Sequence, residues 1–130
     1  MKVLIDTHVF LWWLFDDPKL CTTARNVIAA PANTILLSSA SAWEIATKHR
    51  IGKLPEAKEI IANFQILLDK ARFQILSVTL EHSLKAGSLN IQHKDPFDRM
   101  LIAQAEIENL PIITYDKAFF LDFLTIIPSP

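Results

Sequence analysis

The amino-acid sequence predicts a single α/β domain, a three-layer α/β/α sandwich around a central, mainly parallel sheet of about five strands. Its 130 residues, 51% of them apolar, are sufficient for one domain with a substantial core. Short β-rich runs alternate along the chain with longer segments of helical periodicity. No linker, repeat or low-complexity tract interrupts this alternation, so we expect residues 1–130 to form one domain.

Five short runs have the composition of buried β-strands. They are rich in Ile, Leu, Val and Thr, and most are continuous apolar runs instead of alternating apolar and polar residues. Such runs are typical of parallel strands whose two faces are both covered by helices. The predicted strands are KVLI at 2–5, TILLS at 34–38, FQILSV at 73–78, PIITY at 111–115 and TIIP at 125–128.

The segments between the strands carry apolar residues at helical spacing. Gly52 provides a helix stop, Leu54 and Pro55 restart the chain, and Pro111 closes the last helical segment. We therefore expect helices over residues 8–14, 22–29, 40–51, 56–70, 80–89 and 96–110.

Charge and cysteine content exclude several classes of protein. The 13 basic and 14 acidic residues nearly cancel, so no overall positive field attracts nucleic acid or a membrane surface. The single cysteine, Cys21, cannot form an intramolecular disulfide, and we expect a protein of the reducing cytoplasm. Asp6 and His8 interrupt the apolar opening run, which is too short to span a bilayer and lacks a signal-peptide cleavage site. We therefore expect no membrane association, and we expect position 1 to belong to the fold.

Five acidic residues are expected at one edge of the sheet. In a parallel sheet the carboxyl ends of all strands lie at the same edge, where ligands bind. Asp6 is the first polar residue after the first strand, and Asp116 follows the fourth. Crossover helices have their amino ends at that edge, which places Glu44, Asp98 and the neighbouring Asp95 there as well.

Carboxylates held close together repel one another, and a bound divalent cation relieves this repulsion. Hard oxygen ligands without a histidine or cysteine cluster suit Mg²⁺ or Mn²⁺. No zinc site is expected, because the histidines lack the close spacing of zinc ligands. These histidines are His8, His49, His82 and His93.

Each acidic residue also fits an ordinary structural role. Asp6 and Asp116 are suitable caps at strand-to-helix turns. Asp95 is the strongest such case, because proline follows it at the first helical position. Glu44 is the hardest to explain in this way, since Lys48 is its only obvious basic partner one helical turn away.

Three segments together resemble PIN-domain ribonucleases, and within them the VapC-type toxins of type II toxin–antitoxin systems. They are VLIDTHVFLW at the amino end, SSASAWEIATKHRIGKL in the middle, and HKDPFDRMLIAQAEIENLPIITYD late in the chain. In each segment the acidic residue, its spacing and its predicted strand or helix agree with the family pattern. The resemblance covers nearly the whole chain and implies a PIN-like fold.

The resemblance also implies site residues. The first family acid matches Asp6, the second Glu44 and the fourth Asp116. The third best matches Asp98, with Asp95 as a competitor. All five are candidate metal ligands: Asp6 by direct coordination, Glu44 and Asp98 directly or through water, and Asp116 by holding a second ion or orienting the water.

The function implied by the resemblance is a Mg²⁺- or Mn²⁺-dependent endoribonuclease that hydrolyses phosphodiester bonds of RNA, as the toxin of a toxin–antitoxin pair. Its implied partners are an RNA substrate, a cognate antitoxin protein and a second copy of the chain. The alternative is a non-catalytic module of the same fold that binds RNA or protein. An active enzyme is compatible with either growth arrest or RNA processing.

Overall fold

The computed structural model describes residues 1–128 and is built on a five-stranded sheet in which every neighbouring pair is parallel. The strand order is β3-β2-β1-β4-β5. This arrangement confirms the predicted three-layer α/β/α fold, although the last three strands are shorter than the sequence predicts. The strands are β1 Lys2–Ile5, β2 Thr34–Ser38, β3 Phe73–Leu76, β4 Ile112–Ile113 and β5 Ile126–Ile127.

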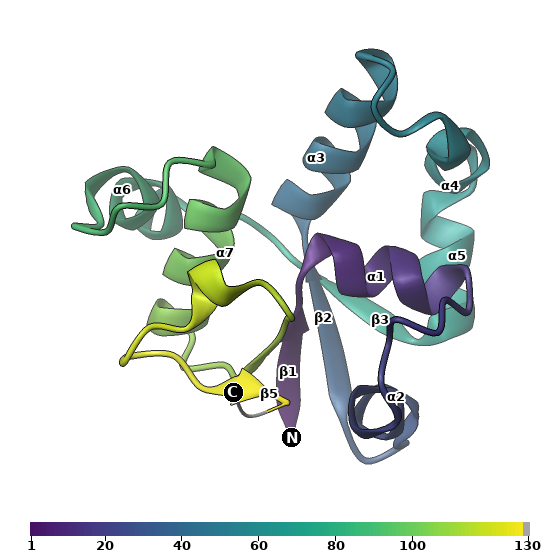
Figure 1. Cartoon of the computed structure of the whole chain (residues 1–130), viewed down its shortest axis with the longest axis horizontal. Helices are drawn as coiled ribbons and strands as arrows, with labels where there is room; N and C mark the ends of the chain where they lie inside the picture. Colours follow the sequence, from purple (N-terminus) through teal and green to yellow (C-terminus); the bar gives the residue numbers. More distant parts are fainter. Residues whose placement is uncertain (129–130) are drawn as a thin grey trace.

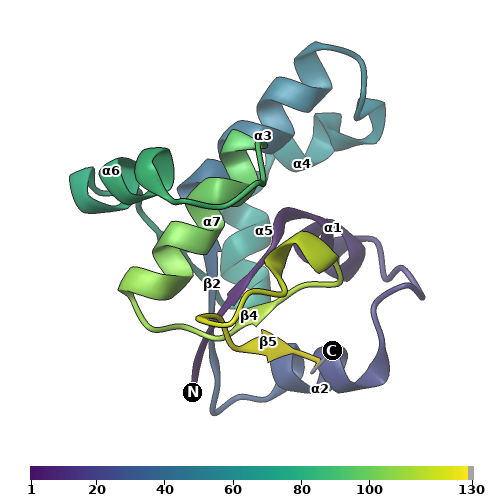
Figure 2. The ribbon, with the colours of Figure 1, turned by 60° about the vertical axis from the view of Figure 1, so that its left-hand side comes forward.

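Helices cover both faces of the sheet. In Figure 1, α1, α2 and α5 lie on one side of β1 and β2, and α6 and α7 lie on the other. Figures 1 and 2 both show α3 rising beyond the sheet edge at which β2 ends. The helices are α1 Thr7–Leu14, α2 Thr22–Ala29, α3 Ser39–Arg50, α4 Lys58–Ala62, α5 Phe64–Ala71, α6 Leu80–Ser88 and α7 Pro96–Ile107, with 3₁₀ turns η1 Pro55–Ala57 and η2 Lys117–Phe119.

The two sides of the sheet carry separate hydrophobic cores. Successive side chains of a strand point to opposite faces, so Val3 and Ile5 enter one core while Leu4 enters the other. The first core packs against α1, α2, α4 and α5, and the second packs against α7. This double coverage explains why β1 reads as a continuous apolar run.

The predicted single helix over residues 56–70 is wrong, because the chain breaks at Asn63. This residue has φ −123° and ψ 26°, outside the helical range, and separates α4 from α5. Its side-chain amide donates a 2.9 Å hydrogen bond to the Glu59 carbonyl. The Asn63 N–H donates to the same carbonyl at 3.1 Å, so the side-chain bond adds to the helical one, and the non-helical dihedrals of Asn63 end α4. Asparagine has a low helix propensity, which favours a break at this position.

Strand register brings the ends of the three central strands level. Ile5 pairs with Leu37 on one side and with Ile113 on the other. The next residues, Asp6 and Thr114, therefore stand side by side, and the Asp6 N–H donates to the Ile113 carbonyl at 3.1 Å. Helices α1 and α3 begin directly after their strands, so their first turns lie at the same edge.

The first core predicts a large loss of stability for Phe10→Ala. Phe10 is fully buried, with ring centroids 5.4 Å from Phe64 and 6.1 Å from Phe73. We expect a loss of about 3–5 kcal/mol in the free energy of unfolding, measured by urea denaturation. The control Phe15→Ala, on a side chain 50% exposed, should cost less than about 1 kcal/mol. Equal losses in the two variants would contradict this description of the core.

Candidate metal centre

Asp6 lies at the junction of β1 and α1 with only 5% of its surface exposed. Its Oδ1 accepts a 2.8 Å hydrogen bond from the Val9 N–H and so caps α1. Burial raises the pKa of Asp6, and hydrogen bonds from the Thr114 side chain and from Val9 oppose this rise. The negative charge of Asp116 raises the pKa further, which shows that the two acids are near each other.

Glu44 lies in α3 with 3% of its surface exposed, and both of its carboxylate oxygens have partners. Oε1 accepts a 2.6 Å hydrogen bond from the Thr7 hydroxyl, which connects α3 to the first turn of α1. Oε2 forms a salt bridge with Lys48, one helical turn later. The ion pair between Glu44 and Lys48 that the sequence left open is therefore present. The Glu44 carboxylate in this pair is buried and not solvated.

The two acids of the DPFD segment are separated in position and role. Asp95 caps α7: its Oδ1 accepts from the N–H groups of Phe97 and Asp98 at 2.9 and 3.0 Å. Asp98, in the first turn of α7, instead places Oδ2 at 2.8 Å from Nε2 of His93. Asp95 thus performs the structural role that its proline neighbour predicts, and Asp98 faces the sheet edge.

Asp98 has the clearest electrostatic signature of a functional carboxylate. Burial is the main cause that raises its pKa, to about 6, and the hydrogen bond from His93 opposes the rise. The charges of Asp95 and Glu44 add to it. A bound cation would remove this cost of ionisation, because it compensates the same negative charges.

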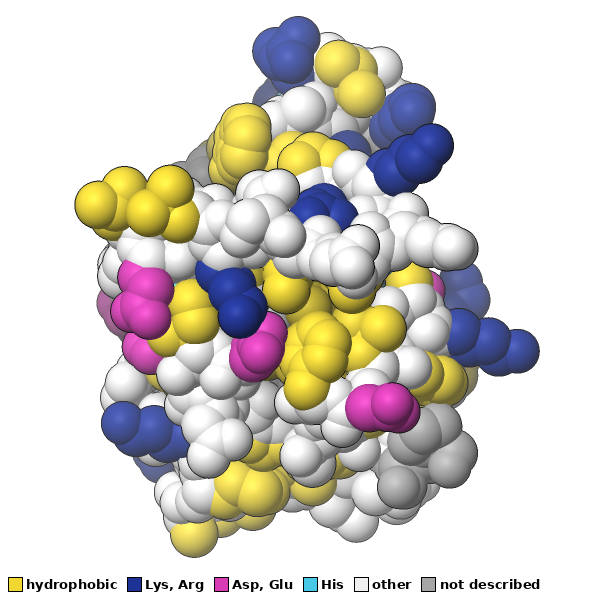
Figure 3. All heavy atoms as spheres, turned by 90° about the vertical axis from the view of Figure 1, so that its left-hand side faces the viewer, with side chains coloured by type: hydrophobic (Ala, Val, Ile, Leu, Met, Phe, Trp, Pro, Cys, Tyr) yellow, Lys and Arg dark blue, Asp and Glu magenta, His cyan; other side chains and the backbone are white. Residues whose placement is uncertain are grey.

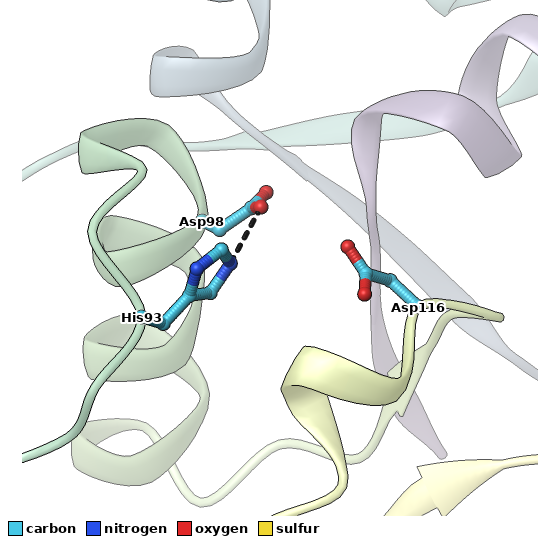
Figure 4. Close-up of side chains that lie close together, drawn as sticks. All are labelled: His93, Asp98 and Asp116. Atoms are coloured by element: carbon cyan, nitrogen blue, oxygen red, sulfur yellow. Dashed lines mark hydrogen bonds and ion pairs between the residues drawn. The ribbon is translucent and has the colours of Figure 1, made fainter.

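Three side chains form a group with the spacing of metal ligands. One donor atom each of His93, Asp98 and Asp116 lies within 4.8 Å of the others, and no further such group occurs among residues 1–128. Figure 4 shows that they come from the segment before α7, from α7 itself and from the segment between β4 and η2. Asp116 is exposed, and its Oδ1 also accepts from the Ala118 N–H at 2.9 Å.

The structure thus brings Asp98 and Asp116 within ligand distance of each other. Asp6 and Glu44 do not belong to this group, although the charge of Asp116 acts on Asp6 and that of Glu44 acts on Asp98. From the sequence, His93 is a candidate to line the crevice but not a ligand, because the histidines have no close partners along the chain. The signal that could have found it is its position in HKDPFD, just before the acids that open α7.

A family model described as PIN domain matches residues 3–122. The chain therefore belongs to the PIN domain family.

A curated relative is Ribonuclease VapC16 of Mycobacterium tuberculosis, which is 50% identical to this chain over 42 residues. That match spans 29% of this chain and 30% of the relative's length.

Solved structures share the fold along nearly the whole chain. A chain of VapBC2 from Rickettsia felis, bound to a DNA fragment from its promoter, has a TM-score of 0.70 at 19% identity, with 97% of both chains covered. A chain of VapBC-1 from nontypeable Haemophilus influenzae has a TM-score of 0.68 at 18% identity, covering 97% of this chain and 96% of that one. At these identities the likeness shows the fold alone.

Among residues 1–128, the helices are all too short or too polar to cross a membrane.

The pKa of Asp98 predicts how stability depends on pH in the metal-free protein. The folded-state value of about 6 lies above the ordinary 3.8, so between them the folded chain binds more protons than the unfolded chain. The contribution of Asp98 is therefore fully present below about pH 4 and is lost as the pH rises through about 6. We expect Asp98→Asn to be more stable than wild type near neutral pH, by up to about 3 kcal/mol, and to lose that advantage near pH 4.

Urea unfolding in EDTA at the two pH values measures this difference. The matched control is Asp69→Asn, which alters an exposed acid on α5. That substitution should shift stability equally at both pH values. If Asp98→Asn also changed the free energy of unfolding equally at both pH values, burial would not raise the pKa of Asp98.

Proposed function

We propose that this chain is a metal-dependent endoribonuclease that hydrolyses phosphodiester bonds of RNA, and that it is the toxin of a type II toxin–antitoxin pair. The observation that carries the proposal is the meeting of Asp98 and Asp116 at the carboxyl edge of a parallel sheet. Membership of the PIN domain family and the local identity to a relative named as a ribonuclease support the same activity.

The proposed metal is Mg²⁺ or Mn²⁺. Asp98 and Asp116 are its central ligands, and Asp6, Glu44 and Asp95 contribute directly, through water or by their charge. The donor set fits such an ion because it is rich in hard carboxylate oxygens. Burial disfavours the ionised forms of Asp6 and Asp98, and a bound cation would stabilise those forms. When bound, the ion lowers the pKa of a coordinated water and stabilises negative charge on the phosphate.

The protein's own residues would orient the reacting groups. The hydroxyl of Thr7 and the ammonium of Lys48 hold the Glu44 carboxylate, while the Val9 N–H and Thr114 hold that of Asp6. Such partners fix the direction in which a carboxylate presents its oxygens. We assign Asp116, the most exposed of these acids, to a second ion or to orientation of the attacking water.

RNA phosphates need a local positive surface, because the whole chain has a net charge of −1. The last turn of α3 and the residues after it supply Lys48, Arg50 and Lys53. Figure 3 views the molecule from the left-hand side of Figure 1 and shows Lys and Arg side chains gathered at the top, where α3 ends. We propose that Arg50 and Lys53 contact the substrate backbone beside the cleaved bond, while Lys48 remains paired with Glu44.

Cleavage of total RNA by the purified, partner-free chain tests the activity. We expect cutting with Mn²⁺ or Mg²⁺ and none in EDTA, and a loss of at least about 100-fold in Asp6→Asn and in Asp98→Asn. Asn keeps the shape of the side chain and removes its charge. The control Asp69→Asn, on α5, should cut like wild type.

Full activity of Asp6→Asn, or cutting that persists in EDTA, would contradict the proposed mechanism. A folded wild-type chain that binds RNA without cutting it would instead favour the non-catalytic binding module.

We further propose a cognate antitoxin as protein partner, a homodimer as the working assembly and a cytoplasmic location. Support for the antitoxin comes from the fold shared with the two VapBC structures and with a chain of a toxin–antitoxin complex from Klebsiella pneumoniae. Co-purification after expression with the neighbouring gene tests the antitoxin, and light scattering of the isolated chain tests the dimer. A stable monomer that captures no partner would contradict both proposals.

A further inference from the structure

His93 is the one side chain of the close group that is not a carboxylate. Its Nε2 lies 2.8 Å from Oδ2 of Asp98, and one donor atom each of His93, Asp98 and Asp116 falls within 4.8 Å of the others. Ligands at adjacent positions of an octahedral ion, with bonds of about 2.1 Å, lie about 3 Å apart, and opposite ligands about 4.2 Å apart. The 2.8 Å between Nε2 and Oδ2 therefore fits two adjacent ligands of one ion, and the 4.8 Å limit on the distances to Asp116 is slightly wider than the separation of opposite ligands.

The segment that carries His93 is held in place by Arg99. The guanidinium of this α7 residue donates to the carbonyls of Ala86, Leu89 and His93 at 2.9, 2.7 and 2.8 Å. The imidazole also stands edge-on to Phe119, with ring centroids 6.4 Å apart. Arg99 thus holds the connection between α6 and α7 at several points, one of which is the carbonyl of His93 itself.

Exposure and direction also favour a ligand role. The side chains of His93 and Asp98 are each 21% exposed, so the pair is partly shielded from water yet accessible to an ion. Figure 4 shows the imidazole and both carboxylates directed towards the space between α7 and the segment that carries Asp116.

We propose that Nε2 of His93 is a metal ligand together with the carboxylates of Asp98 and Asp116, and that it gives the site a preference for Mn²⁺ over Mg²⁺. This inference rests on the proposed metal-dependent function. Mg²⁺ favours an all-oxygen environment, whereas an imidazole nitrogen binds first-row transition metals in preference to Mg²⁺. Arg99 is a positioning residue in this arrangement and does not itself contact the ion.

The opposing view is that His93 only orients Asp98. In that case its Nε2–H donates to Oδ2, and the ring stays outside the coordination sphere, as supporting partners of metal ligands commonly do. The two views differ in one observable, which is whether a nitrogen atom is bonded directly to the ion.

Pulsed electron paramagnetic resonance of Mn²⁺ bound to the full chain measures that bond. We expect modulation of the electron spin echo by a coordinated ¹⁴N nucleus in the wild type. Protein labelled with ¹⁵N only at histidine should lose the ¹⁴N signal and replace it with that of ¹⁵N. This comparison needs no substitution, so it holds even if a variant folds poorly.

Substitutions add a measurement of affinity by calorimetry. We expect His93→Gln to lose the nitrogen signal and to bind Mn²⁺ at least about tenfold more weakly, with a much smaller change for Mg²⁺. The matched control is His49→Gln in α3, where Nδ1 lies 3.1 Å from the Leu54 carbonyl. That variant should keep both the signal and the affinity.

The outcomes separate this inference from the proposed function. Mn²⁺ that binds wild type and is lost in Asp98→Asn, but shows no histidine nitrogen signal, would overturn the ligand role of His93 and leave the carboxylate site intact. A wild-type chain that binds neither Mn²⁺ nor Mg²⁺ would overturn the metal-dependent function, and this inference with it.

Discussion

The parallel pairing of β1 with β2 and β4 is the constraint on which the site depends. It brings the carboxyl ends of three central strands level, so that Asp6 and Thr114 stand side by side at one edge. The crossover helices return on both faces and begin at the same edge. Residues up to 110 positions apart in the sequence, Asp6 and Asp116, are thereby brought close enough for one charge to raise the pKa of the other.

Gathering carboxylates in this way costs free energy, and the chain compensates each buried acid differently. Glu44 has a salt bridge with Lys48, Asp98 has a hydrogen bond with His93, and Asp6 has only neutral hydrogen-bond partners and the more distant charge of His8. The raised pKa values of Asp6 and Asp98 show that their compensation is incomplete. A site that is destabilised without a cation and relieved by one is a physical basis for metal binding.

Capping and site chemistry do not exclude each other here. Asp6 caps α1, Asp95 caps α7 and Asp116 caps η2, and in each case the bond to a backbone N–H uses Oδ1. Capping fixes the orientation of the carboxylate while its second oxygen remains a potential donor to an ion. The hydrogen bond by which an aspartate caps a helix or 3₁₀ turn therefore also orients its carboxylate towards a possible ion.

The sequence by itself determined the fold class, the five strands and the expectation that five acids lie near one edge, because apolar runs, caps and strand ends are read from neighbouring residues. It also predicted the capping role of Asp95, since an aspartate before proline is a local helix start. It failed at Asn63, whose non-helical dihedrals end α4 within a segment that has a continuous apolar pattern.

Only the tertiary structure decided which groups meet at ligand distance. His93 reaches Asp98 because Arg99 gathers the carbonyls of the α6–α7 connection, and Thr7 reaches Glu44 because α1 packs near α3. Periodicity and propensity place a residue on an element or at an edge. Distances between side chains depend on how loops close and helices pack, and these are set by contacts between residues far apart in the chain.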